Sequence, residues 1–389
     1  MRTSTSTACA PSTFAGCFHG GAFFQAIGER FDALDRRQHI INADVLDAWF
    51  PPSPCVIAAL TEHLPWLLQT SPPTNCGGLI DEIAEARGLA PECVLPGAGS
   101  SDLIFLALRQ WLDRSSRALV LDPSYSEYTH MLEQVIGCRV DRLRLAREDS
   151  YRVPLDRLAE SLRKSYDLVV LVNPNSPTGQ FVSRDELQTV LADAPARTRV
   201  WIDETYIDYV GREQSLERWA TQADNVVVCK SMSKVYALSG ARVAYLCGSA
   251  RQIDPLRRLT PPWAVSLLAQ VAAVAALHDP QYYEIRQRET HALRDQLATG
   301  LSSLGWDVVP GCANFLLAHL PADWPTAQNV ITRCRERGLF LRDVSSMGTD
   351  FDGQTVRIAV KDGATQVRML DILRETAGSK PASRIGDQT

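Results

Sequence analysis

The middle of the chain alternates short apolar runs, rich in β-branched residues, with amphipathic segments. The apolar runs lie at residues 117–122, 167–173, 199–204, 225–231 and 242–248. Helical patterns separate most of them, such as residues 184–194, which follow a turn at 175–179. Nearly continuous apolar strands that alternate with helices are typical of a mainly parallel sheet with both faces covered. This pattern predicts an α/β fold whose ligands bind at the carboxyl ends of the strands.

The pattern changes after residue 263, where the regular alternation stops. A long charged helix is predicted over residues 282–305, and apolar runs follow within 306–320 and 353–360. These segments predict a smaller α+β unit. We therefore expect an N-terminal arm that packs with the small domain, a large domain, the small domain itself and a disordered tail. Their bounds are residues 1–50, 51–265, 266–378 and 379–389.

The composition limits the partners of the protein. Of its 389 residues, 45% are apolar and 22% are charged, which is ordinary for a soluble globular protein. The net charge of -5 argues against nucleic-acid binding. The ten cysteines include no C-x-x-C pair, so we expect free thiols, no metal centre and a cytoplasmic location. The start lacks a signal-peptide pattern, and the longest apolar run, 267–277, is too short to span a bilayer.

Small, polar and aromatic residues follow the predicted strands. Gly99, Ser100 and Ser101 open an apolar helix, whose free N–H groups favour a phosphate, although an ordinary serine cap shows the same residues. Tyr125 follows the next strand and is suited to stacking on a flat ring or to packing within its loop. Asn175 lies in the turn after the third strand. Each of these features alone has a structural explanation.

The two remaining strand ends carry ionisable side chains. Asp203 ends one strand and precedes Tyr206, although an aspartate there also suits a helix cap. Lys230 and Lys234 follow another strand within a serine-rich stretch, in a chain that has only five lysines. Pyridoxal phosphate has a phosphate, a flat ring, a ring nitrogen that needs a carboxylate, a phenolic oxygen and an aldehyde that needs a lysine. This cofactor therefore accounts for the whole set of strand ends.

With these residues the chain resembles the fold type I pyridoxal-phosphate enzymes, in their histidinol-phosphate aminotransferase and threonine-phosphate decarboxylase branch. The most specific motif is S-x-S-K followed by G-x-R, here Ser231, Ser233, Lys234, Gly240 and Arg242. The resemblance covers nearly the whole chain, from residue 19 to 374. It implies a mainly parallel, seven-stranded-type sheet in the large domain and a smaller α+β domain. Lys234 would be the Schiff-base lysine, the two serines would hold the phosphate, and Arg242 would be its guanidinium clamp.

The resemblance also implies roles for the other strand ends. Asp203 would pair with the pyridinium nitrogen, Tyr206 with the ring oxygen, and Tyr125 would stack on the ring. The segment 99–101 would receive the phosphate. Lys230 falls where relatives tolerate other residues, so we interpret it as structural.

The substrate would be held by residues outside the large domain. The resemblance matches Arg357 to the arginine that grips the α-carboxylate, and Arg342 to one that binds a substrate phosphate. His19, in a His-Gly-Gly opening like that of the threonine-phosphate decarboxylases, would touch the same phosphate. Asn314 lies at the usual substrate-facing turn. A surface ion pair for Arg342 and a turn role for His19 stay open as alternatives.

Three departures from the family pattern concern the same pocket. Ser176 replaces the asparagine that contacts the ring oxygen, which leaves Asn175 as the nearest substitute. The segment 68–78 lacks the tyrosine that reaches the neighbouring subunit's cofactor phosphate. The substrate arm contains the acidic Asp44 and Asp47. These changes point to a substrate other than histidinol phosphate.

The leading hypothesis is thus a pyridoxal-phosphate aminotransferase that is homodimeric, as its relatives are. Its substrate would be a small molecule, an α-amino acid, and its substrate pocket would differ from that of its relatives. A decarboxylase of a phosphorylated or acidic amino acid, and an enzyme of carbon–carbon bond formation or γ-replacement, stay open. A binding protein without cofactor would have lost Lys234 or Asp203, and both are present.

Overall fold

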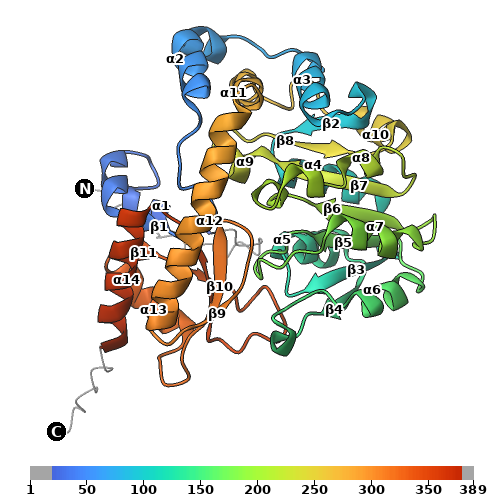
Figure 1. Ribbon diagram of the computed structural model, residues 1–389. Coiled ribbons are helices and arrows are strands. Elements are labelled where there is room, and N and C mark those ends of the chain that lie inside the picture. Colours follow the sequence, from blue (N-terminus) through green and yellow to red (C-terminus); the bar gives the residue numbers. More distant parts are fainter. Residues whose placement is uncertain (1–19, 379–389) are drawn as a thin grey trace, which may run out of the picture.

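A computed structural model describes residues 20–378 of the chain (Figure 1). Its largest element is a seven-stranded sheet in the order β2-β8-β7-β6-β5-β3-β4. β8 is antiparallel to both of its neighbours, whereas the other neighbouring pairs are parallel. The strands are β2 (Val94–Gly97), β3 (Arg117–Asp122), β4 (Arg139–Arg144), β5 (Leu168–Val172), β6 (Arg199–Asp203), β7 (Val226–Ser231) and β8 (Ala244–Cys247). The expected mainly parallel α/β sheet is confirmed.

The sequence pattern found five of these strands and missed the two at the edges of the sheet. β2 is only four residues long and contains Pro96. β4 exposes Arg139, Arg142 and Arg144, and only Leu143 within it is fully buried. β4 is covered less than a central strand, so it lacks the continuous apolar run that marks a strand buried on both faces. β2 is buried throughout, but its short length and its proline hide it from the pattern.

Helices cover both faces of the sheet, as the alternating side chains of β5 show. Leu168, Val170 and Val172 pack in the same apolar cluster as α4 and α10, whereas Val169 and Leu171 pack with α6 and α7. The four helices are α4 (Ser100–Trp111), α6 (Leu155–Leu162), α7 (Arg184–Ala192) and α10 (Ala250–Arg257). Successive strand residues point to opposite faces, so a strand that is apolar throughout stabilises both layers.

The one antiparallel strand brings a distant residue to the functional edge. β7 ends at Ser231, and this residue lies opposite Ala244 at the start of β8. Because β8 runs in the reverse direction, its beginning lies at the edge where the parallel strands end. Arg242, just before β8, therefore lies beside the loop that follows β7.

Short helical turns follow three of the strands at this edge. They are α5 (Ser126–Thr129) after β3, a 3₁₀ turn (Ile207–Tyr209) after β6 and α9 (Met232–Val235) after β7. Another short helix, α8 (Glu217–Ala220), precedes β7. These turns keep the segments that follow the strands close to the end of the sheet.

A smaller antiparallel sheet in the order β12-β13-β10-β9 forms the second unit. Its elements are β9 (Asp307–Val309), β10 (Phe315–His319), β12 (Arg342–Asp343) and β13 (Thr355–Ala359), with α13 (Ala327–Arg335) and α14 (Gly363–Gly378). The N-terminal arm, with α1 (Phe23–Ile27), joins this unit because β1 (Ile41–Asn42) pairs with β11 (Leu339–Phe340).

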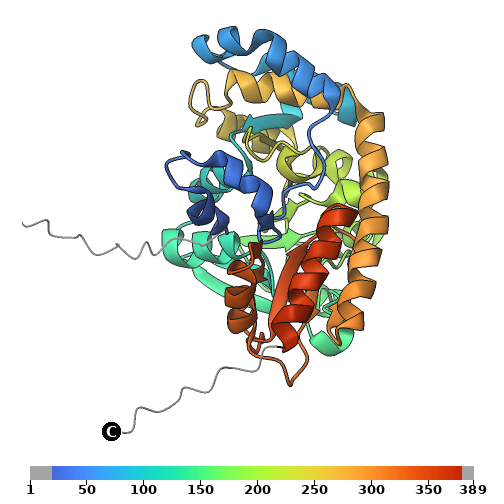
Figure 2. The same cartoon turned by 90° about the vertical axis from the view of Figure 1, so that its left-hand side faces the viewer.

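Two further helices connect the units. α11 (Leu267–Leu277) packs against α2 (Pro54–Gln69) and α3 (Gly77–Arg87) beside the large sheet. α12 (Pro280–Ser303) runs from there along one side of the molecule to β9, β10 and α14 (Figure 2). One apolar cluster extends from α2 and α3 through α11 and α12 into β10 and β13, so the division into domains stays a prediction. The expected disordered tail lies outside the described residues.

Within residues 20–378, none of the helices is long and apolar enough to cross a membrane. Each cysteine described, from Cys55 to Cys334, is a free thiol.

Candidate active site

A cavity of about 280 Å³ opens where the strands of the large sheet end. Residues from the large sheet, the arm and the small sheet line it together. The polar lining residues are Ser100, Ser101, Tyr125, Ser176, Asp203, Thr205, Tyr206, Ser231, Ser233, Lys234, Arg242, Arg342 and Arg357. The structure thus brings most of the residues that the sequence singled out into one place.

One end of the cavity is suited to a phosphate. The backbone at Gly99 has φ +94°, and a side chain at this position would collide with the guanidinium of Arg242. Ser100 begins α4, and no side chain caps the first turn of that helix, so its N–H groups face the cavity end. Arg242 also donates a hydrogen bond from Nη1 to the Ser233 hydroxyl at 3.5 Å. A guanidinium, hydroxyl groups and a helix N-terminus meet here.

A buried carboxylate also lines the cavity. Asp203 is 3% exposed, and burial raises its pKa. Its Oδ1 accepts hydrogen bonds from the main-chain N of Thr205 at 2.9 Å and from Thr205 Oγ1 at 2.6 Å. Its Oδ2 accepts one from the Tyr128 hydroxyl at 2.7 Å, and Trp201 Nε1 donates to that hydroxyl at 2.7 Å. These contacts hold the carboxylate in place and leave it acceptor capacity toward the cavity.

Two aromatic residues flank this carboxylate. Burial raises the pKa of the Tyr206 hydroxyl, which therefore stays protonated and able to donate a hydrogen bond. Burial and the neighbouring Glu127 raise the pKa of Tyr125 as well, and its hydroxyl donates to Glu127 at 2.6 Å. Both tyrosine rings line the cavity.

Lys234 is the one lysine that lines the cavity within residues 20–378. Its Nζ lies 2.9 Å from Asp47 Oδ1 and 3.5 Å from the Ser239 hydroxyl. Burial lowers the pKa of the amine, although Asp47 opposes the shift. A lower pKa increases the fraction of neutral amine, which is the nucleophilic form. Burial also lowers the pKa of nearby Lys361 to about 8, against the opposing charge of Asp47.

The small sheet supplies two arginines to the cavity. Arg342 and Arg357 lie directly opposite each other on β12 and β13, so their side chains share one face. Arg357 Nη1 donates to the Ser176 hydroxyl at 3.0 Å, and Nη2 donates to the main-chain O of Asp44 at 3.1 Å. Arg342 Nη1 lies 3.5 Å from Asp44 Oδ1. Burial lowers the pKa of Arg357 to about 10, which still leaves it charged at neutral pH.

Three residues expected at the site are placed elsewhere or not described. Asn175 does not line the cavity, because its side chain is buried in its own loop and bonds Pro123 O, Thr178 and Ser124. Ser176 takes its place in the lining. Asn314 does not line the cavity: it is buried and donates to Leu46 O at 3.0 Å. His19 lies outside the described residues.

Thr205 and Tyr128, which hold Asp203, were not predicted from the sequence. Thr205 sits two residues after the aspartate, a spacing typical of local side-chain to backbone bonds, and this signal was available. Tyr128 lies 75 residues before Asp203, and no local pattern connects the two. Only the packing of α5 against β6 brings them together.

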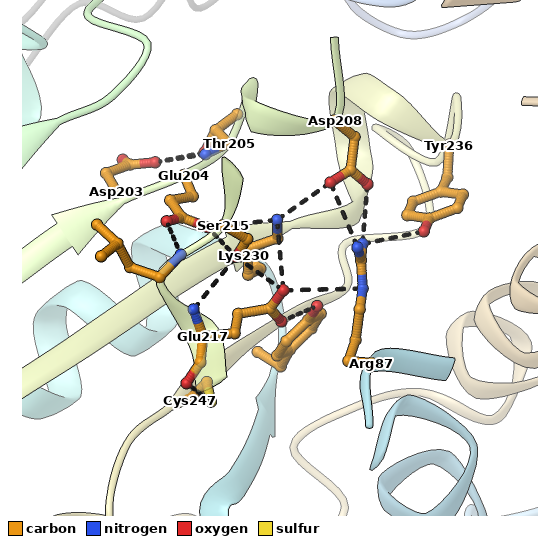
Figure 3. Close-up of polar contacts among 12 residues, drawn as sticks. Arg87, Asp203, Glu204, Thr205, Asp208, Ser215, Glu217, Lys230, Tyr236 and Cys247 are labelled. Carbon is orange, nitrogen blue, oxygen red and sulfur yellow. Dashed lines mark hydrogen bonds and ion pairs between the residues drawn. The ribbon is translucent and has the colours of Figure 1, made fainter. Parts of the chain in front are cut away.

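Lys230 belongs to a buried ionic cluster next to the cavity (Figure 3). Its Nζ lies 3.2 Å from Asp208, 3.6 Å from Glu204 and 3.8 Å from Glu217. Arg87 bonds the other oxygen of Asp208 at 2.8 Å. Three carboxylates and two cations thus meet under the strand ends, which explains why Lys230 is structural. Glu204 directly follows Asp203, so the cluster also anchors the strand end that enters the cavity.

This cluster leads to a prediction about pH. Burial raises the pKa of Glu204 from 4.5 to about 7, against the opposing charge of Lys230. Between these values the folded state holds a proton that the unfolded state has lost, so this group's stabilising contribution is complete below pH 4.5 and falls as the pH rises through about 7. We expect the free energy of unfolding of wild type, relative to Glu204→Gln, to fall by on the order of 3 kcal/mol over this range.

Urea unfolding at a series of pH values measures this difference. Glu213→Gln removes an exposed carboxylate from the same loop and serves as the control. Parallel pH profiles for wild type and Glu204→Gln would contradict the prediction.

The cavity fits pyridoxal phosphate. A glycine that no side chain can replace, uncapped helix N–H groups and Arg242 suit the phosphate, and Asp203 suits a protonated ring nitrogen. Lys234 is placed to bond the aldehyde carbon, and Tyr125 and Tyr206 border the ring site. No group of three or more metal-ligating side chains is found within residues 20–378.

Residues 46–373 match the model of a family described as aminotransferase class I and II. Histidinol-phosphate aminotransferase of Rhodopseudomonas palustris (strain BisB18) is 32% identical over 306 residues, which cover 77% of this chain and 81% of that protein. The structure of histidinol-phosphate aminotransferase from Sinorhizobium meliloti in complex with pyridoxal-5'-phosphate is 21% identical, with a TM-score of 0.81 and coverage of 96% and 99%. L-threonine-O-3-phosphate decarboxylase from Porphyromonas gingivalis is 22% identical, with a TM-score of 0.74 and coverage of 86% and 99%.

Proposed function

The chain belongs to the class I and II aminotransferases, and we propose that it uses pyridoxal phosphate, bonded to Lys234, to transfer the amino group of an α-amino acid. The observation that carries this proposal is that Lys234, Asp203, Arg242 and Arg357 line one cavity from four separate segments. A lysine amine, a buried carboxylate, a phosphate clamp and a carboxylate clamp are the set that this chemistry requires.

The roles of the residues follow from their contacts. When bound, pyridoxal phosphate supplies an aldehyde that condenses with a primary amine and a ring that withdraws electrons from the amine-bearing carbon. Asp203, held by Thr205 and Tyr128, keeps a negative charge beside the ring nitrogen. Arg242 and the start of α4 would hold the phosphate, and Asp203 would pair with the ring nitrogen, so the protein would fix the cofactor at two points.

Two further residues act on the substrate. Arg357 binds the α-carboxylate and so orients the bonds of the α-carbon. Its Nε is buried, and the structure of residues 20–378 offers that atom no hydrogen-bond partner, which suits a bidentate ligand. Lys234, whose pKa burial lowers, would accept the proton that leaves the α-carbon and would donate it again when the amino group is transferred.

A panel assay tests this function. Purified protein loaded with pyridoxal phosphate is mixed with single amino acids and a 2-oxo acid acceptor, and the new 2-oxo acid is measured. Formation of a 2-oxo acid supports amino transfer. Release of carbon dioxide without 2-oxo acid would favour decarboxylation, which the bound α-carboxylate also permits, and would overturn amino transfer. A product that keeps both the amino group and the carboxylate would favour side-chain replacement.

We also propose that the active form is a homodimer. α2 exposes four apolar side chains, a concentration that is unusual on the surface of a monomer. They are Ile57 (48% exposed), Leu64 (42%), Trp66 (53%) and Leu68 (67%). We expect light scattering to give twice the chain mass of 43.0 kDa, and Trp66→Glu to shift the equilibrium toward monomer. A monomeric wild type at micromolar concentration would contradict this proposal.

A further inference from the structure

A carboxylate of the N-terminal arm faces the amine of Lys234. Asp47 Oδ1 lies 2.9 Å from Lys234 Nζ, and among residues 20–378 no other carboxylate lies within ion-pair distance of that amine. The Lys234 side chain is 19% exposed and the Asp47 side chain is 36% exposed, so water screens their interaction only in part. The proposed amino transfer assigns a role to Lys234 and none to Asp47.

The arm is fixed on both sides of Asp47. Just before it, the main-chain O of Leu46 accepts a hydrogen bond from the buried Asn314 Nδ2 at 3.0 Å. Shortly after it, Trp49 Nε1 donates to Thr290 Oγ1 on α12 at 2.8 Å. The position of the carboxylate is therefore set by the fold as well as by its attraction to the amine.

Positive charges surround this ion pair. Burial lowers the pKa of Lys234, and Arg357 on β13 and Arg242 before β8 lower it further, whereas Asp47 opposes them through its charge and its hydrogen bond. Against the effect of burial, Lys234 and then Lys361, which follows β13, lower the pKa of Asp47. The carboxylate thus stays ionised between two amines.

The other acidic groups near the cavity supply no second counter-ion within residues 20–378. Burial raises the pKa of both Tyr125 and Tyr206, so their hydroxyls stay protonated. Asp203 and Asp44 lie beyond ion-pair distance of the Lys234 amine, and Asp44 contacts Arg342 instead. The charge of the Lys234 amine is therefore balanced by Asp47.

We propose that Asp47 is a positioning residue that stabilises the protonated amine of Lys234 while Lys234 carries the proton of the α-carbon. This inference rests on the proposed function. When the C–H bond of the α-carbon breaks, its electron pair is delocalised toward the electron-withdrawing ring, and a new N–H bond forms on the amine. That N–H bond breaks again when the proton is delivered to the carbon that held the aldehyde. The amine is positively charged between the two steps, and a carboxylate beside it offsets that charge in a site rich in cations.

The amine can be titrated in the cofactor-free enzyme, where Lys234 is not bonded to the aldehyde. Acetic anhydride reacts with neutral amines, and mass spectrometry gives the rate of acetylation of Lys234 at each pH. We expect the midpoint of this pH profile to lie about one pH unit lower in Asp47→Asn than in wild type, because the variant loses the charge that favours the ammonium form. Asp47→Glu keeps the charge and should restore most of the shift.

Single-turnover kinetics of the loaded enzyme provide the second measurement. The probe is the amino acid that yields the most 2-oxo acid in the panel assay. At high pH, where the amine is neutral in both proteins, the maximal rate of Asp47→Asn should fall about three- to tenfold, because a weaker base takes up the proton more slowly. The dissociation constant of the amino acid should change less than about twofold, since Arg357 still binds its carboxylate.

Asp35→Asn is the matched control. It removes the same charge from an exposed position of the same arm, where the nearby cation is Arg37. This variant should keep the wild-type midpoint and the wild-type maximal rate. An effect as large as that of Asp47→Asn would overturn the inference, because a general change in the charge of the arm would then explain both.

Two further results would overturn the inference. They are an acetylation midpoint in Asp47→Asn that equals or exceeds that of wild type, and a maximal rate at high pH that equals that of wild type. If Asp47→Asn does not fold, Asp47→Ser removes the same charge with a smaller side chain and is measured in its place. Absence of a 2-oxo acid product together with the expected midpoints would overturn the proposed amino transfer, and the control of the Lys234 amine by Asp47 would stand.

Discussion

Lys234→Arg should yield a folded protein that no longer forms a covalent link to pyridoxal phosphate, with amino transfer lowered on the order of 10³-fold or more. The arginine keeps a positive charge next to Asp47, which pairs with Lys234 at 2.9 Å in the native protein, so the arm retains its ion pair. A guanidinium does not lose its proton at neutral pH, so it can neither attack the aldehyde nor accept the proton of the α-carbon. The variant therefore separates the structural role of the positive charge from the chemical role of the amine.

Mass spectrometry after borohydride reduction detects the link and identifies the modified residue. Lys361→Arg is the matched control, since Lys361 also lies near Asp47 and also has a lowered pKa. That variant should still carry the cofactor on Lys234. Reduced cofactor bound to Lys361 or Lys230 in the Lys234→Arg protein would contradict the assignment of Lys234.

Lys230→Ala should destabilise the protein by about 3–5 kcal/mol, the typical cost of leaving buried charges unpaired. Lys230 is 3% exposed and lies within ion-pair distance of Glu204, Asp208 and Glu217. Without it, Arg87 still contacts Asp208 and Glu217, but Glu204 has no cation within ion-pair distance in the described part of the chain. Burial of a carboxylate is costly unless a positive charge or a proton compensates it.

Urea unfolding of wild type and variant measures this loss. Lys164→Ala removes an exposed lysine and should stay within about 0.5 kcal/mol of wild type. The double variant Lys230→Met with Glu204→Gln removes one charge of each sign, so it should regain part of the loss. A single Lys230→Ala variant that is as stable as wild type would show that the cluster does not stabilise the fold.

The strand ends illustrate how much of the site the sequence could predict. Asp203, Lys234 and Tyr125 follow three different strands, and parallel strands bring their carboxyl ends to one edge. Recognising the strands was therefore enough to predict that these residues meet. To predict that Arg242 joins them, the direction of β8 must also be known. Arg242 precedes β8, and it reaches the same edge only because β8 is antiparallel to its neighbours.

Asn175 and Ser176 show where the sequence could not decide. Both lie in the same turn, and the family pattern favoured an asparagine at the cavity. The structure turns Asn175 into the loop, where Ser124, Thr178 and Pro123 use its polar atoms, and leaves Ser176 to bond Arg357. Two neighbouring residues of a tight turn can point their side chains in opposite directions, and the periodicity of the sequence does not predict these directions.

The sequence by itself determined the α/β class, the positions of the central strands along the chain and the cofactor chemistry at their ends, because burial on two faces and the small residues of a phosphate site leave local patterns. The tertiary structure alone decided which charges face each other. Asp44 and Arg342 are 298 residues apart, and Lys230 lies in β7 whereas Asp208 lies in the turn after β6, so no local pattern records either pair. A side chain's charge is visible in the sequence, but its partner is chosen by packing, and a buried charge is tolerated only where packing supplies such a partner.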